Sequence, residues 1–115
     1  ATVTHAPRLH CVGYRIEYQG HVATYSGDSL YCDSLVRLCR DADLAVLDCS
    51  FPENRPGEGH LHAGLCGRVA QEAGVNQLIL SHFYPIAERY DVCAQAKQYF
   101  PGKVKMAKDR LKLRA

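Results

Sequence analysis

Apolar and polar residues alternate along this chain with periods that change several times. Alternation in Leu9–Tyr18 predicts a strand, and Gln19–Gly20 predicts a tight turn that returns the chain along His21–Tyr25. The apolar runs Leu44–Leu47 and Gln77–Leu80 are typical of strands that are buried on both faces. These segments therefore predict a hairpin near the start of the chain and two later strands in the interior of a sheet.

Apolar residues at helical spacing predict three helices, at Leu30–Arg40, Leu61–Ala73 and Tyr90–Tyr99. Asp28 or Ser29 would cap the first helix, and Gly74 would end the second. Two short strands, Lys103–Met106 and Leu111–Leu113, are predicted to finish the chain. Helices that alternate with buried strands indicate an α/β layer structure without an internal domain boundary.

Composition narrows the class of protein further. The chain has 115 residues, 47% of them hydrophobic and 23% charged, which suits one globular domain without a membrane span. The net charge of +2 is too small to indicate nucleic-acid binding by itself. The six cysteines form no C-x-x-C pair and lie in regular helix and strand patterns, so we expect free thiols in a cytoplasmic protein. The chain begins with Ala and a strand-like segment, from which we expect it to be a piece of a longer protein.

Three polar residues stand where an α/β protein places its chemistry. Asp28 and His82 each follow a predicted strand, and ligand sites gather at the carboxyl ends of strands. His60 stands between a loop rich in Gly and Pro and the start of a helix. Each has a simpler interpretation: Asp28 as a turn or cap residue, His82 as a hydrogen-bonded histidine, and His60 as a polar helix start.

Five segments together resemble one protein family. They follow the order of conserved segments in metallo-β-lactamase-fold hydrolases of the ribonuclease Z-like branch, and they span nearly the whole chain: Gly13–Ser29 ("GYRIE…YSGDS"), Asp43–Phe51, Gly59–Ala63 ("GHLHA"), Leu78–Pro85 ("LILSHFYP") and Lys105–Arg110. The resemblance implies an α/β fold that is half of a metallo-β-lactamase αββα sandwich, a mixed sheet with helices on one face.

The resemblance also implies roles for single residues. Asp28 would bridge two metal ions and His82 would ligate one of them; zinc is expected, and other divalent metals are open. His60 would assist catalysis beside the scissile phosphate. The start of a helix disfavours a protonated imidazole, so His60 would need a carboxylate nearby, and Asp48 at the end of the adjacent strand is the candidate.

The chain also departs from the family. It lacks the H-x-H-x-D-H metal motif, so we interpret residues 1–115 as the C-terminal half of the domain, with the N-terminal half as a second chain or fragment. The complete protein would be a zinc-dependent hydrolase and a homo-oligomer, with RNA or a small phosphodiester as substrate and a metal-bound water as nucleophile. Tyr84 replaces a usual serine, which argues against tRNA processing. The alternative is a non-catalytic binding or assembly module that keeps the fold.

Overall fold

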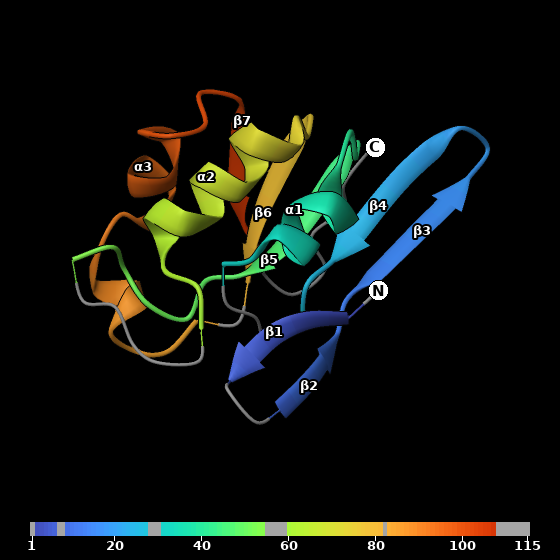
Figure 1. Cartoon of the computed structure of the whole chain (residues 1–115). Helices are drawn as coiled ribbons and strands as arrows, with labels where there is room; N and C mark the ends of the chain where they lie inside the picture. The colour runs from blue at the N-terminus through green and yellow to red at the C-terminus, as the bar shows by residue number, and fades with distance from the viewer. Residues whose placement is uncertain (1, 7–8, 28–30, 55–59, 82, 108–115) are drawn as a thin grey trace.

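A five-stranded sheet runs through the middle of the protein (Figure 1). The computed structural model describes the chain apart from residues 1, 7–8, 28–30, 55–59, 82 and 108–115, and only the backbone of 2–6 and 9–12. The strands lie in the order of their numbers: β3 (Tyr14–Tyr18), β4 (His21–Tyr25), β5 (Leu44–Asp48), β6 (Gln77–Ser81) and β7 (Lys103–Met106). The pair β3–β4 is antiparallel and the other pairs are parallel, so the sheet is mixed, as the resemblance implies.

Three α-helices and one 3-10 turn connect the parallel strands. They are α1 (Asp33–Cys39), α2 (Ala63–Ala73), the 3-10 turn η1 (Ala87–Arg89) and α3 (Val92–Lys97). None of the helices in the described ranges is long and apolar enough to cross a membrane. A separate two-stranded hairpin, β1 (Thr2–Ala6) and β2 (Leu9–Val12), precedes the sheet and contacts α1.

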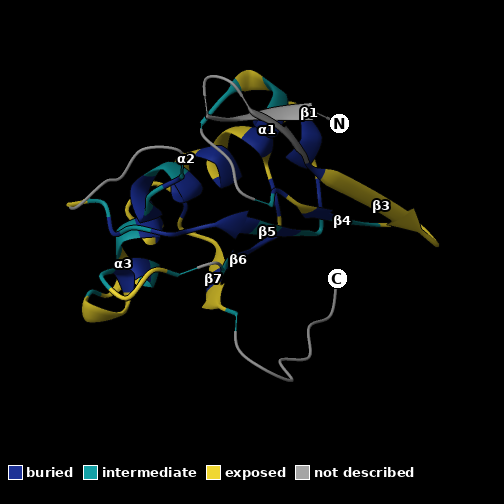
Figure 2. Ribbon diagram, turned by 90° about the horizontal axis from the view of Figure 1, so that it is seen from below, coloured by how far each residue is buried: buried dark blue, intermediate teal, exposed yellow. Residues whose placement is uncertain are grey.

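The hydrophobic core lies between the helices and one face of the sheet. Leu47, Leu78 and Leu80 point to this face and are fully buried in one cluster with residues of all three α-helices. Seen from below in Figure 2, α1 and α2 lie on one side of β5 and β6. The predicted arrangement of a mixed sheet with helices on one face is therefore confirmed.

The opposite face has no such helical cover among the described residues. Side chains of Tyr14, Ile16, Tyr18 and Tyr25, which alternate with the helix-facing positions of β3 and β4, are largely exposed. Toward the middle of the sheet this face becomes more protected: Leu44 and Val46 are half-buried and Ile79 is buried.

Several boundaries differ from those predicted. The strand predicted over Leu9–Tyr18 is broken at Gly13, and β2 and β3 belong to different sheets. A Cβ at Gly13 would stand 2.5 Å from Leu38 Cδ2 of α1. The caps predicted for α1 are wrong, because the helix begins at Asp33 with Cys32 as its N-cap and with no side-chain cap bond. The helix predicted over Tyr90–Tyr99 is shorter in the structure, where α3 covers Val92–Lys97, and the turn η1 before it was not predicted. The strand predicted at Leu111–Leu113 lies outside the described residues.

Candidate functional site

The carboxyl ends of β4, β5 and β6 meet at one edge of the sheet. Just beyond β4, the Ser26 backbone N–H donates to Val46 O at 3.0 Å, and Ser26 Oγ accepts from the Asp48 N–H at 2.9 Å. Just beyond β5, the Cys49 N–H donates to Ser81 O of β6 at 2.7 Å. Asp48, the last residue of β5, therefore lies between the ends of its two neighbouring strands.

Asp48 is a buried carboxylate whose two oxygens are both engaged. Oδ1 accepts a hydrogen bond from Ser50 Oγ at 2.6 Å, and Oδ2 lies 2.8 Å from His60 Nδ1. The Asp48 side chain is 0% exposed and that of His60 is 11% exposed. An ionised carboxylate only accepts hydrogen bonds, so Nδ1 of His60 donates to Asp48 and Nε2 remains for other partners. The carboxylate that sequence analysis expected beside His60 is in contact with it.

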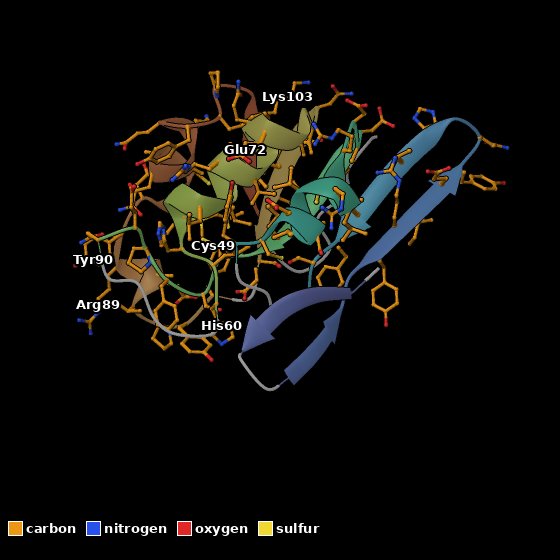
Figure 3. All side chains as sticks on the ribbon, viewed as in Figure 1. Cys49, His60, Glu72, Arg89, Tyr90 and Lys103 are labelled. Carbon is orange, nitrogen blue, oxygen red and sulfur yellow. The ribbon has the colours of Figure 1, made fainter. Side chains whose placement is uncertain are left out.

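The segment around His60 is fixed by the end of β5 and the start of α2. Phe51 and His62 form an isolated parallel bridge, in which the Ala63 N–H donates to Phe51 O at 3.0 Å. His62 is the N-cap of α2 and accepts from the Leu65 N–H through Nδ1 at 3.3 Å. Figure 3 shows His60 at the same end of the molecule as Cys49, and Glu72 and Lys103 at the other end.

Tyr84 completes the surroundings of His60. Its hydroxyl lies 3.1 Å from His60 Nε2, and its ring packs against the Phe51 ring in an edge-on arrangement with centroids 5.0 Å apart. The Tyr84 backbone N–H donates to Ser50 O at 3.1 Å. Sequence analysis missed Ser50 and treated Tyr84 only as a departure from the family. The sole available signal for Ser50 was its position two residues after Asp48.

Burial shifts the pKa of two groups beside this site. It lowers the pKa of His62, which favours the neutral ring that capping requires; the charge of Glu53 partly opposes the shift. It raises the pKa of the Cys66 thiol well above its usual value, with further contributions from Cys49 and Asp48. Cys66 Sγ donates to Asp48 O at 3.0 Å, so this thiol supports the end of β5.

The predicted metal ligands Asp28 and His82 lie outside the described residues. Within the described ranges, no group of three or more His, Cys, Asp or Glu side chains could hold a metal ion. Asp48 is already bonded through both oxygens, and His60 through both ring nitrogens. The described cysteines, Cys32, Cys39, Cys49, Cys66 and Cys93, are free thiols.

This arrangement can orient an imidazole and move a proton. A buried carboxylate that is itself hydrogen-bonded holds one nitrogen of the ring, and the other nitrogen faces a hydroxyl group at a partly exposed position. Such an imidazole suits proton transfer at an oxygen atom. The ends of β4 and β6, after which Asp28 and His82 follow in sequence, are hydrogen-bonded to the backbone of Asp48 and Cys49 at the end of β5.

Comparison with known proteins gives consistent matches. The profile of the "Beta-lactamase superfamily domain" matches residues 2–83. The chain is 34% identical over 112 residues to the probable metallo-hydrolase YhfI of Bacillus subtilis. This match covers 93% of this chain and 46% of that protein. It is 33% identical over 113 residues to ribonuclease Z of Thermobifida fusca, covering 92% of this chain and 36% of the relative.

A solved structure gives the same result for the fold. The crystal structure of the metallo-beta-lactamase fold protein YhfI from Bacillus subtilis superimposes with a TM-score of 0.84 at 31% identity, over 93% of this chain and 45% of that one. The chain thus spans less than half the length of these relatives. By its sequence profile and its fold, this chain belongs to the beta-lactamase superfamily and has part of the metallo-β-lactamase fold.

Proposed function

We propose that this chain is the C-terminal half of a metal-dependent hydrolase that cleaves phosphodiesters. The observation that carries the proposal is the bonded pair Asp48–His60, held at the edge where the carboxyl ends of three strands meet. A superfamily whose named relatives include a probable metallo-hydrolase and a ribonuclease Z supports hydrolysis and a divalent metal.

Proton transfer would be the work of His60. Because Asp48 accepts the Nδ1 proton, Nε2 is the nitrogen that gives a proton to the departing oxygen of the substrate. Asp48 fixes the orientation of the ring and the position of its Nδ1 proton. Ser50 in turn holds the carboxylate through Oδ1. These three residues would act as one unit, with His60 as the member that touches the substrate.

Asp28 and His82 would hold the metal together with donors outside this chain. A carboxylate and a neutral imidazole are suitable ligands for zinc, and two of them fall short of the three protein ligands of an open catalytic site. When bound, zinc or another divalent metal would polarise the phosphoryl oxygen and lower the pKa of the attacking water. The missing donors would come from an N-terminal half.

The exposed sheet face supports a missing half. Tyr14, Ile16 and Tyr18 form a continuous apolar side of β3, and a contiguous apolar surface usually marks an interface. An N-terminal half packed on this face would complete the αββα sandwich. A homo-oligomer, a cytoplasmic location and the choice between RNA and a small phosphodiester stay predictions.

The test uses the complete polypeptide that contains this chain, loaded with zinc and supplied with bis(p-nitrophenyl) phosphate. We expect hydrolysis, and we expect His60→Ala to lower kcat on the order of a hundredfold with metal content unchanged, because only the proton donor is lost. His21→Ala, at the exposed start of β4, is the matched control and should keep full activity. Absence of hydrolysis by the wild-type protein, or full activity of His60→Ala, would contradict the proposal.

A further inference from the structure

The hydroxyl group of Tyr84 occupies the nitrogen of His60 that the proposed reaction needs. Its oxygen lies 3.1 Å from Nε2, and the two ring centroids are 5.2 Å apart. The Tyr84 side chain is nevertheless 40% exposed, so solvent borders the ring. A partly exposed tyrosine thus contacts the nitrogen that the proposed reaction uses.

Hydrogen-bonding rules show that this contact suits both forms of the imidazole. The Asp48 carboxylate fixes the proton on Nδ1, so the neutral ring presents a lone pair at Nε2. A phenol hydroxyl carries one donor and can also accept. Tyr84 can therefore donate to the neutral ring and accept from the protonated ring without moving. An alcohol or phenol oxygen leaving a phosphate ester makes the same two interactions.

Two hydrogen bonds fix the backbone of Tyr84 independently of its side chain. The Tyr84 N–H donates to Ser50 O, and Tyr84 O accepts from the Ala87 N–H at 2.9 Å. Phe51 contacts the ring edge-on, with an angle of 67° between the ring planes. Rotation of the side chain would break the contact of its hydroxyl with Nε2 and leave these two backbone bonds intact.

We propose that Tyr84 is a positioning residue that caps Nε2 of His60 in the resting protein and is displaced by the leaving-group oxygen of the substrate. This inference rests on the proposed function. It assigns the leaving group as an alcohol or phenol oxygen that replaces the tyrosine hydroxyl on the same nitrogen. Displacing the tyrosine hydroxyl would weaken substrate binding and so raise KM. It would leave kcat, the rate of the chemical step, unchanged.

The variant Tyr84→Phe removes the hydroxyl and keeps the ring. In the complete zinc-loaded polypeptide, we expect KM for bis(p-nitrophenyl) phosphate to fall about two- to tenfold, the range that a single hydrogen bond supports, with kcat within twofold of wild type. Tyr90→Phe is the matched control, since no described residue bonds to its hydroxyl, and it should change neither constant.

A second measurement detects the contact between the Tyr84 hydroxyl and His60 Nε2 in the absence of turnover. The 15N chemical shift of His60 Nε2 in the substrate-free polypeptide, assigned by its loss in His60→Asn, should move in Tyr84→Phe and stay in Tyr90→Phe. An unmoved Nε2 shift, or a fall in kcat at constant KM, would overturn the cap while hydrolysis by the wild type persisted. Failure of the wild type to hydrolyse the ester would overturn the proposed function and, with it, displacement by a leaving group.

Discussion

The two faces of the sheet are built differently. On the helix-covered face, Leu47, Leu78 and Leu80 are fully buried. On the other face, Ile16 and Tyr18 of β3 are 63% and 70% exposed. The helices of this chain therefore cover one face of the sheet, and no described helix covers the other face over β3 and β4.

The apolar and charged residues of β3 lie on the opposite faces from those of an ordinary surface hairpin. Arg15 points to the helix side, where its guanidinium donates to Leu38 O at 2.8 Å and to Arg40 O at 2.9 Å at the end of α1. The apolar residues of β3 point away from the core of this chain. A hairpin at a solvated surface places its apolar residues toward the core. The reversed pattern of β3 is what a strand needs if a second layer packs on it.

The largest effect is expected on the uncovered face. Ile16→Asp in the complete polypeptide should lower the free energy of unfolding by about 3 kcal/mol or more, because it would bury a charge against the N-terminal half. Urea unfolding measures this change. Gln19→Asp is the matched control, since Gln19 lies in the exposed turn at a φ of 49° that Asp tolerates. Equal, small effects of the two substitutions would mean that nothing packs on this face.

A smaller effect is expected where α2 and α3 meet on the covered face. A Cβ at Gly67 would lie 2.2 Å from Ala96 O, so Gly67→Ala should force the helices apart and cost about 2 kcal/mol. Gly64→Ala on the same helix gains the same helix propensity, but its Cβ would meet the Glu53 side chain, which has rotatable bonds. Thermal unfolding should rank the two variants in this order, and the reverse ranking would refute the close approach.

The smallest effect concerns His62 and pH. Burial lowers the pKa of His62 from 6.5 in the folded protein, so below that pH the unfolded state binds more protons and stability falls. His62→Thr keeps a capping side chain and removes the titrating group. The loss of stability between pH 7.5 and 5.5, measured by urea unfolding, should be smaller in this variant. His21→Thr at the exposed start of β4 should leave that loss as in wild type.

The pattern of apolar and polar residues predicted most of the helices and strands of the sheet. β7 has the predicted bounds, β5 and β6 extend one residue past theirs, and α2 ends at Gly74, whose φ of 74° favours glycine. These elements are set by local periodicity and by one glycine. The break at Gly13 was missed because strand-like patterns stand on both sides of it, so local periodicity does not separate β2 from β3.

The site was predicted in part for a related reason. Asp48 was named as the partner of His60 from its place at the end of a buried strand, and the two are in contact. Tyr84 reaches His60 because residues 83–87 turn back over Ser50 and Phe51, a path that no periodicity records. Asp28 and His82 stay predictions, because they lie outside the described residues.

The most direct test of the account is a calorimetric titration with zinc of this chain alone and of the complete polypeptide, with circular dichroism to confirm that both are folded. We predict two tightly bound ions in the complete polypeptide, loss of tight binding in its His82→Ala variant, and only weak binding by this chain, because two protein ligands do not complete a site. Tight binding of two ions by this chain alone would contradict the claim that it supplies half of a shared metal site.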